Sequence, residues 1–386
     1  MATNPKMVNL ALQGGGAHGA FAWGVLDKLL EDGRVDIEGL SAASAGAMNA
    51  SVYAFGKMTG GTDGARQALH DFWSRISAAG SLYSPAKRMP WEFWSMGGNS
   101  DNSLGYWLFD SVTRMFSPYQ LNPFDINPLR DVLTASVDFE KLVMCQCTNL
   151  FISATNVRTG KVRVFKNEEM SLDVVMASAC LPYLFKAVEI GGEHYWDGGY
   201  MGNPALFPLF YHTGSKDVII LHLNPIHRAD IPKTSVDIAD RINEISFNSS
   251  LLKELRAVAF VNKLIDEDWV KEEYRARLKH VLVHSIRADM ALSDLNVSSK
   301  FNCDWDFLTS LRDKGRETAA EWLDKNYQHL GKQSTVDLRA EYLGLHSGGI
   351  VDEHHQKSQP NPTNGRKAKT RSAPASEIKP TIRAIS

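Results

Sequence analysis

The sequence predicts an α/β protein in which a mostly parallel sheet is covered by helices on both faces. Short apolar runs typical of strands alternate with longer segments of helical spacing along the chain. Twice near the N-terminus a strand passes into a helix through a tight turn of small residues. The 386 residues are 44% hydrophobic, which is enough to bury one large core.

The first strands and helices are predicted where apolar residues change their spacing. Residues 8–12 predict a strand, and residues 20–30 predict the helix that follows a run of glycines. A second strand is predicted at residues 37–41, with a helix of small residues at 45–54 directly after it. Residues 63–78 predict a surface helix with one apolar face.

Residues 84–128 differ in composition from the rest of the chain. Large aromatic and methionine side chains gather there among prolines, glycines and asparagines, without a clear period. We interpret this insertion as a cap over the carboxyl edge of the sheet. Its rings either contact acyl chains or a membrane surface, or they pack the cap itself.

The alternation of strands and helices resumes after the cap. Strands are predicted at residues 150–155, 162–165, 217–223 and 280–286, and helices at residues 235–264, 269–278 and 305–327. Residues 158–161 predict the turn of a hairpin between the first two of these strands. We therefore expect one domain over residues 1–355.

The C-terminal residues 356–386 predict a disordered tail, because large apolar side chains are almost absent. The tail holds seven basic residues and one acidic residue, within a chain whose net charge is -2. The net charge of -2 argues against a nucleic-acid partner, because a nucleic-acid-binding protein would normally carry a basic face. The rest of the chain outside the tail carries about -8, so the charge is unevenly distributed. A weakly basic tail could favour anionic surfaces or simply be solvated.

Cysteine content and hydropathy indicate a cytoplasmic protein. The four cysteines are too few for a disulfide scaffold, and Cys145 and Cys147 are separated by one residue rather than two. No secretory signal and no apolar run of about 20 residues is visible, so lipid contact is expected to be peripheral. No metal site or cofactor is expected. Nothing in the sequence indicates an oligomeric state.

The first chemical motif is a glycine-rich loop between the first strand and helix. It reads Gln13-Gly14-Gly15-Gly16-Ala17-His18-Gly19. Gly14, Gly16 and Gly19 have the spacing of a dinucleotide fingerprint, with Asp36 or Glu38 in the place of its acidic residue. The same glycines could instead turn backbone N–H groups toward a developing negative charge. Neither interpretation is favoured by this segment alone.

The second motif is a strand-to-helix turn around Ser44, reading Ala42-Ala43-Ser44-Ala45-Gly46. A nucleophile elbow needs small neighbours, because its serine sits on a strained turn close to other backbone. Glycine is usual two residues before that serine, and Ala42 stands there instead. A merely structural turn of small residues is the competing interpretation.

The third motif is Asp197-Gly198-Gly199, which follows a predicted apolar segment. Such a sequence commonly forms a simple turn. A serine nucleophile nevertheless needs a base, and a desolvated carboxylate within reach can accept its proton.

Together and in this order, the three motifs resemble the patatin-like phospholipase family. The resemblance extends over about residues 7–223 and includes the segments 153–160 and 177–182. It implies a three-layer α/β/α fold and hydrolysis of lipid acyl esters by a Ser-Asp dyad through a covalent acyl-enzyme. By position, it implies Ser44 as nucleophile, Asp197 as base and the amides of Gly14, Gly15 and Gly16 as the oxyanion hole.

Two residues depart from the family pattern. His18 stands where the family usually has arginine or lysine, so a cation there would be only partly present near neutral pH. Ala42 replaces the elbow glycine. Neither departure removes a member of the implied dyad.

Several alternatives remain open on sequence grounds. An α/β-hydrolase triad would use His212, His222 or His227, and a nucleotide-binding oxidoreductase would use the glycine loop. A hydrolase-derived lipid-binding protein without activity is the non-enzyme alternative. The substrate could be a phospholipid, a lysophospholipid, a neutral glyceride or a stored polyester.

Overall fold

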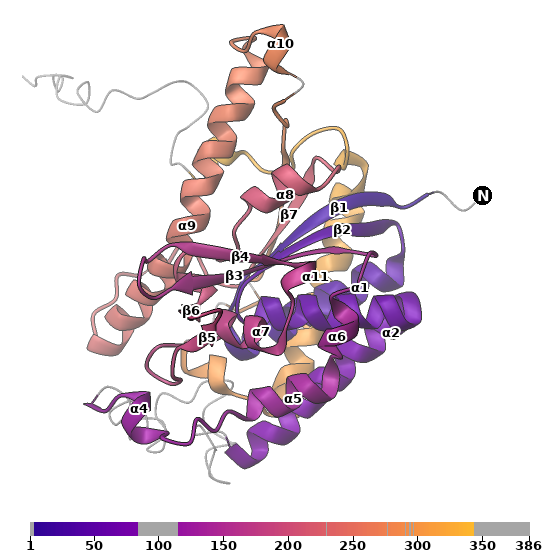
Figure 1. Ribbon diagram of the computed structural model, residues 1–386. Coiled ribbons are helices and arrows are strands. Elements are labelled where there is room, and N and C mark those ends of the chain that lie inside the picture. Colours follow the sequence, from indigo (N-terminus) through magenta and orange to yellow (C-terminus); the bar gives the residue numbers. More distant parts are fainter. Residues whose placement is uncertain are drawn as a thin grey trace, which may run out of the picture.

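The computed structural model describes residues 4–83 and 115–342, apart from positions 229, 276, 290, 293, 294 and 296 (Figure 1). Most of the expected cap, residues 84–114, lies outside the described residues. The expected tail, residues 356–386, also lies outside them.

The described residues form an eight-stranded sheet with the order β5-β6-β3-β2-β1-β7-β8, and β4 pairs with β3. The strands are β1 (Lys6–Leu12), β2 (Val35–Ala42), β3 (Asn149–Asn156), β4 (Val162–Lys166), β5 (Val188–Ile190), β6 (Glu193–Asp197), β7 (Asp217–His222) and β8 (Leu282–Arg287). The pairs β1–β2, β1–β7, β2–β3 and β7–β8 are parallel. Strands β4, β5 and β6 pair antiparallel at one side, so the sheet is mostly parallel, as predicted.

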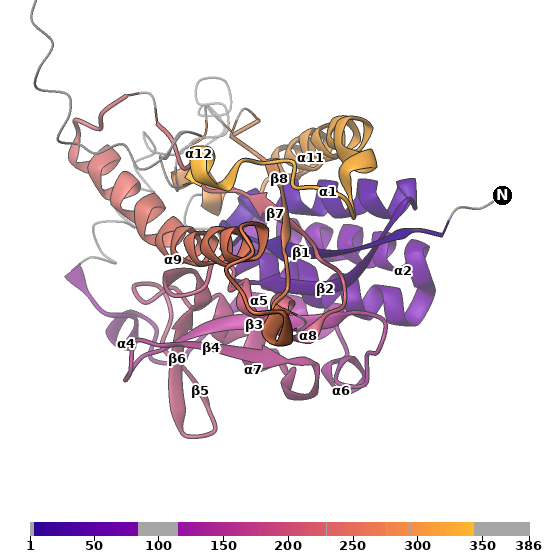
Figure 2. The same ribbon diagram turned by 90° about the horizontal axis from the view of Figure 1, so that it is seen from above.

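Helices cover both faces of this sheet (Figures 1 and 2). They are α1 (Gly19–Asp32), α2 (Ala45–Tyr83), α4 (Pro118–Leu121), α5 (Pro128–Ser136), α6 (Phe139–Leu142), α7 (Leu172–Ser178), α8 (Phe207–His212), α9 (Ser235–Asp266), α10 (Glu272–Arg275), α11 (Trp305–Asn326) and α12 (Leu338–Tyr342). Three short 3-10 turns matter below, namely η1 (Gly16–His18), η4 (Gly198–Tyr200) and η5 (Val297–Phe301).

The burial pattern of the central strands shows why three layers form. Leu10 and Leu12 of β1 belong to a core shared with α1, α2 and α11, whereas Ala11 belongs to a second core shared with α8, α9 and α12. Successive strand residues point to opposite faces, so both faces of an apolar strand need a helical cover. The predicted α/β/α fold is confirmed.

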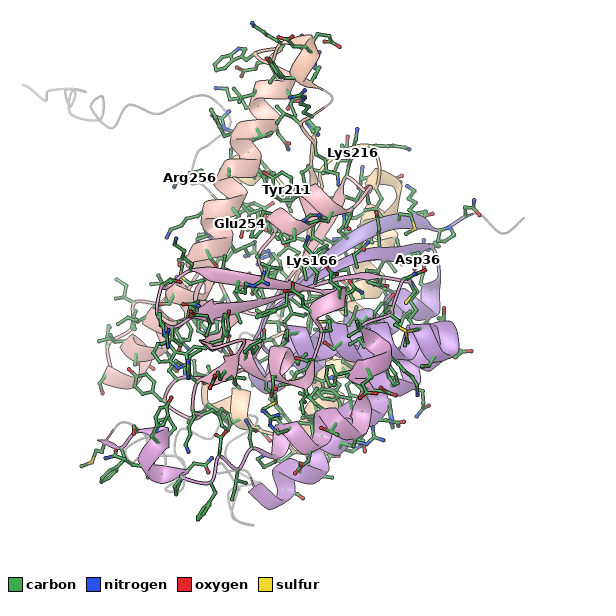
Figure 3. All side chains as sticks on the ribbon, in the orientation of Figure 1. Asp36, Lys166, Tyr211, Lys216, Glu254 and Arg256 are labelled. Atoms are coloured by element: carbon green, nitrogen blue, oxygen red, sulfur yellow. The ribbon has the colours of Figure 1, made fainter. Side chains whose placement is uncertain are left out.

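Glu254 illustrates how the layer formed by α8 and α9 is held. Glu254 lies on α9 (Figure 3). Its carboxylate accepts the N–H groups of Leu206 and Phe207 at 2.8 and 2.9 Å, at the beginning of α8. Burial raises the pKa of Glu254 to about 7, while these two hydrogen bonds favour the charged form. The side chain thus supplies acceptors that the first N–H groups of a helix lack.

The strand register brings three distant segments to one edge of the sheet. Leu12 and Ala42 are paired at the carboxyl ends of β1 and β2, so the loop after each strand begins at the same place. Strands β2 and β6 pair with the same edge of β3, β2 over residues 149–152 of β3 and β6 over residues 154–156. Strand β4 pairs with the opposite edge of β3. The end of β6 therefore lies directly beyond the end of β2.

One predicted helix is mostly not helical. Residues 269–278 were expected to form a helix, but the chain forms only the single turn α10. Asp268 has a φ of 55°, which turns the chain away after α9, and Trp269 is 63% exposed. A short amphipathic segment without a core to pack against does not hold a longer helix. Among the described residues, no helix combines the length and apolar character needed to cross a bilayer.

Candidate active site

Ser44 lies in the strained turn between β2 and α2. Its φ is 53°, in the left-handed region that non-glycine residues rarely adopt. The Ser44 N–H donates to the hydroxyl oxygen of Ser178 at 2.9 Å and to its carbonyl oxygen at 3.2 Å. Ser44 is partly exposed, and it immediately precedes the positive end of the α2 dipole. The hydroxyl is thus held in a sharp turn and is accessible.

The neighbours of Ser44 explain why this turn is built from small residues. A Cβ atom on Gly46 would lie 2.5 Å from the Leu12 carbonyl oxygen, and one on Gly19 would lie 2.8 Å from the Cβ of Ala45. Ala42 is completely buried in the core on the α2 side of the sheet. The methyl group that departs from the family pattern is therefore accommodated.

The glycine loop packs directly against the serine. A Cβ atom on Gly14 would lie 2.5 Å from the Ser44 Cβ, so a larger residue cannot occupy this position without a shift. The Gly14 N–H donates to the Asn203 side chain at 2.7 Å. No hydrogen bond of the Gly15 or Gly16 N–H is found within the described part of the chain. Gly16 is exposed and has a φ of 58°.

Asp197 lies at the end of β6 and is fully buried. Its Oδ1 accepts the Gly199 N–H at 2.6 Å, its N–H donates to the Cys180 carbonyl at 2.8 Å, and its carbonyl accepts the Thr155 hydroxyl at 2.8 Å. The Asp-Gly-Gly sequence thus forms a real turn, η4, with the aspartate as its cap.

The electrostatics of Asp197 are unusual for a carboxyl group. Burial raises its pKa to about 7, although hydrogen bonds from the Gly199 N–H and the Ser44 hydroxyl and the charge of Lys300 lower it. Oδ2 has no partner of standard hydrogen-bond geometry among the described residues, so the Ser44 interaction is long or poorly aligned. Loose contacts of this kind are common in unliganded sites and tighten with substrate.

The glycines after Asp197 allow this close packing. A Cβ atom on Gly198 would lie 2.1 Å from the Ser153 carbonyl oxygen. A Cβ atom on Gly199 would lie 2.3 Å from the Phe247 ring, which belongs to α9. Both glycines therefore let η4 pass between β3 and α9.

His18 does not supply a cation. Burial, helped by the charges of Lys300 and Arg228, lowers its pKa to about 3, and its Nε2 is hydrogen-bonded to the Ser299 hydroxyl at 2.7 Å. The expected partial charge near neutral pH is thus absent, because an imidazolium would lose too much hydration at this position. One nearby basic side chain is Lys300 of η5, which sequence reasoning did not identify and whose own pKa is lowered by burial.

Four buried amide side chains fix the beginning of the glycine loop. Gln13, Asn203, Asn224 and Asn248 are each at most 3% exposed. Sequence reasoning missed all four, because isolated amide residues carry no motif. Ser178 lies in the segment 177–182 that resembles the family, but sequence reasoning assigned it no role. A weak signal existed only for Asn203, which follows Asp197-Gly198-Gly199 within a few residues.

The histidines of the alternative triad lie elsewhere. His222 is buried, its Nε2 is hydrogen-bonded to the Tyr342 hydroxyl at 3.0 Å, and burial lowers its pKa to about 3. The His212 ring stacks on Phe151, and His227 is exposed. None of their contacts in the described residues involves Ser44 or Asp197.

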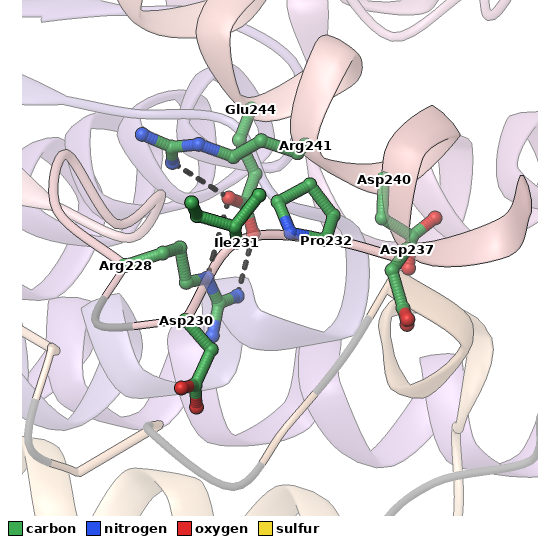
Figure 4. A pocket seen from close by; sticks show the side chains of 8 residues that line it. All are labelled: Arg228, Asp230, Ile231, Pro232, Asp237, Asp240, Arg241 and Glu244. Carbon is green, nitrogen blue, oxygen red and sulfur yellow. Dashed lines mark hydrogen bonds and ion pairs between the residues drawn. The ribbon is translucent and has the colours of Figure 1, made fainter. Parts of the chain in front are cut away.

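A pocket of about 300 Å³ lies at the beginning of α9 (Figure 4). Eight side chains line it: Arg228, Asp230, Ile231, Pro232, Asp237, Asp240, Arg241 and Glu244. Glu244 accepts hydrogen bonds from both arginines, so much of the charge is paired internally. Within the described chain, no group of three or more His, Cys, Asp or Glu side chains could hold a metal ion.

Comparison with known proteins identifies the family of this chain. The family model for patatin-like phospholipase matches residues 10–210. Among solved structures, the crystal structure of VipD from Legionella pneumophila is similar at 15% identity, with a TM-score of 0.38 and coverage of 84% of this chain and 67% of that one. No curated protein matches the sequence. The family match covers the serine turn, the glycine loop and Asp197, and the chain therefore belongs to the patatin-like phospholipase family of serine ester hydrolases.

Proposed function

We propose that this protein hydrolyses lipid acyl esters with Ser44 as nucleophile and Asp197 as base. The observation that carries the proposal is the φ of 53° at Ser44, in a turn packed against the glycine loop. Backbone strain at a non-glycine residue persists only where surrounding structure holds it, and it clusters at functional sites. The buried carboxylate with an unpartnered oxygen beside this serine supports the assignment of the base.

In the proposed reaction, the Ser44 Oγ attacks the ester carbonyl carbon while Asp197 takes the hydroxyl proton. The alcohol then leaves with that proton, and an acyl group remains on the serine. Water then attacks the acyl carbon and gives a proton to Asp197. The bond between that carbon and the Ser44 Oγ breaks, the Oγ takes the proton back from Asp197, and the carboxylic acid is released. A carboxylate whose pKa is about 7 is a better proton acceptor than an ordinary aspartate and is still half ionised near neutral pH.

The negative charge on the tetrahedral intermediate would be stabilised by backbone donors. The sequence predicts the amides of Gly14, Gly15 and Gly16 for this role, but the Gly14 N–H is bonded to Asn203. We therefore assign the oxyanion hole to the Gly15 and Gly16 N–H groups. Each such donor is typically worth about 3 kcal/mol of activation free energy.

The proposed substrate is a lipid, and peripheral membrane contact is part of the proposal. Family membership supports a lipid acyl substrate. In the described end of the predicted cap, Phe124 is 85% exposed and Ile126 is 62% exposed, close to other exposed apolar residues of α4. Exposed apolar groups of this kind commonly mark interaction surfaces. A cytoplasmic location is also proposed.

The experiment is an assay of the full chain against phospholipids, lysophospholipids, neutral glycerides and a polyester, with Ser44→Ala as the control. Hydrolysis of a lipid ester that disappears in Ser44→Ala is the expected result. Lipid binding by the wild type without any Ser44-dependent hydrolysis would instead favour an inactive lipid-binding protein. Hydrolysis only of glycerides or polyester would keep the dyad and show that phospholipids are not the substrate.

A further inference from the structure

A network of side-chain amides holds both backbone groups of Gly14. Its N–H donates to the Asn203 Oδ1 at 2.7 Å, and its carbonyl accepts the Asn224 Nδ2 at 2.9 Å. The Gln13 side chain links the two, since its Nε2 donates to the Asn203 carbonyl at 3.3 Å and its Oε1 accepts the Asn224 N–H at 3.0 Å. The two peptide groups on either side of the Gly14 Cα are therefore each held by a side-chain amide, including the one that precedes Gly15.

Lys300 extends this network from a different part of the chain. Its Nζ donates to the Asn224 Oδ1 at 2.9 Å, which orients the amide so that Nδ2 faces the Gly14 carbonyl. The Lys300 backbone also touches the loop, because a Cβ atom on Gly16 would lie 2.5 Å from the Lys300 carbonyl oxygen. Asn224 lies two residues after the end of β7, and Lys300 lies in η5. Neither residue belongs to a glycine-loop motif.

We propose that Lys300 and Asn224 are positioning residues that set the direction of the Gly15 and Gly16 N–H groups. Both lie beyond residues 10–210, the region that matches the family. The C-terminal part of the chain thereby completes the active site instead of only covering the sheet. This inference rests on the oxyanion hole of the proposed function.

The physical reason is the conformational freedom of three consecutive glycines. Such a segment adopts many backbone conformations at low cost, so its N–H groups point at one place only if neighbouring groups hold them. An oxyanion hole lowers the activation barrier because its donors are oriented before the charge develops. A loss of orientation should therefore slow the chemical step while the binding of substrate changes little.

The test compares Lys300→Met, Asn224→Leu and their double variant, with Lys279→Met as the matched control. Like Lys300, Lys279 is a partly buried lysine whose Nζ donates hydrogen bonds within the protein. Its acceptors are the backbone carbonyls of Leu209 and Thr213, and it lies just before β8, away from the glycine loop. Three measurements are made on the full chain: steady-state kinetics on a short soluble ester, which give kcat and KM, the melting temperature, and hydrogen exchange of a peptide covering residues 13–18.

Lys300→Met is expected to lower kcat by roughly tenfold to a hundredfold, with KM nearly unchanged and exchange in the loop increased. Because both residues act through one path, the double variant should lose little more than the worse single variant. Lys279→Met should leave kcat and loop exchange at the wild-type level. If Asn224→Leu does not fold, the same three measurements on Lys300→Met alone test the positioning role.

A wild-type kcat together with unchanged loop exchange in Lys300→Met would overturn the inference. Additive losses in the double variant would also overturn it, because they would mean that the two residues act separately. Failure of the proposed function looks different. In that case Ser44→Ala retains activity, while faster loop exchange in Lys300→Met still supports the positioning role.

Discussion

Two buried aspartates lie at opposite ends of the central sheet, and their surroundings differ. Asp217 begins β7, and its Oδ1 is hydrogen-bonded to the His284 Nε2 at 2.9 Å and accepts the Gly331 N–H at 2.8 Å. Asp197 ends β6, and its Oδ2 has no partner of standard geometry among the described residues. Burial raises the pKa of Asp197 to about 7.

This difference in hydrogen-bond partners distinguishes a structural carboxylate from a reactive one. A buried carboxyl group costs less free energy when its oxygens are hydrogen-bonded, and the His284 ring and the Gly331 N–H are such partners at Asp217. A buried carboxylate that keeps an open oxygen costs stability but remains able to take a proton. Asp197 fits the second description, and Ser44 lies beside it.

The largest expected effect separates these two aspartates. Ser44→Ala and Asp197→Asn should each lower kcat on a soluble ester by about 10⁴-fold or more, because they remove the nucleophile or its base. Asp217→Asn should keep kcat within about twofold and lower the free energy of unfolding by roughly 1 kcal/mol. Steady-state kinetics and denaturant unfolding measure both quantities. Inactivation by Asp217→Asn in folded protein would remove the distinction.

The next effect compares one glycine from each region. Gly14→Ala should lower kcat by roughly a hundredfold to a thousandfold, because the new Cβ would lie 2.5 Å from the Ser44 Cβ. Gly331 has a φ of 78° and open space around it, so Gly331→Ala should cost about 1 kcal/mol of stability without loss of rate. Equal effects of the two changes on kcat would contradict this contrast.

The pH dependence sharpens the assignment of the base. Since Asp197 must be ionised to accept a proton and its pKa is raised to about 7, kcat/KM should fall about tenfold for each pH unit below 7. Above pH 8, where Asp197 is almost fully ionised, its titration should cause little further change in kcat/KM. The measurement is a profile of kcat/KM on a neutral soluble ester, and a plateau extending down to pH 5 would exclude Asp197 as the base.

The same raised pKa predicts a stability effect of opposite sign. Between the ordinary pKa of 3.8 and about 7, the folded protein binds more protons at Asp197 than the unfolded chain does. This contribution to stability is thus present at low pH and is lost as the pH rises to 7. Asp197→Asn should therefore raise the melting temperature at pH 8, relative to wild type, although it abolishes activity. A lower melting temperature would show that the buried carboxylate is stabilising.

The smallest expected effect concerns the exposed apolar residues of the predicted cap. Phe124→Ser together with Ile126→Ser should reduce hydrolysis of lipid in vesicles by several fold and leave a short soluble ester unaffected. The matched control is Trp269→Ser, because Trp269 is 63% exposed beyond the C-terminal end of α9. Equal loss on both substrates would mean that these residues pack the cap rather than contact lipid.

Much of this fold could be predicted because its strands and helices have clear periods. Residues 8–12 and 217–223 are mostly apolar on both faces, which is typical of central parallel strands, and they lie in β1 and β7. Residues 37–41, which include Glu38, lie in β2. The exception, residues 269–278, has helical spacing but no core to pack against. Spacing alone carries no information about the presence of a partner surface.

The site could be predicted only as far as motifs extend. Ser44, the glycines and Asp197 occur in recognisable local patterns, whereas Lys300 and Asn224 meet the loop through tertiary packing that no local pattern records. The neutral state of His18 was also beyond the sequence, because its low pKa comes from burial. The register of β6 against β3 could not be predicted either, and it is what brings Asp197 beyond the end of β2.

The most direct test of the central claim is covalent labelling of the folded protein with a fluorophosphonate, followed by peptide mass analysis. Labelling of Ser44 is expected in wild type, at a rate that falls below pH 7 and drops strongly in Asp197→Asn. The Asp217→Asn variant should be labelled at the wild-type rate. Absence of a label on Ser44, or labelling of Asp197→Asn at the wild-type rate, would contradict the proposed dyad.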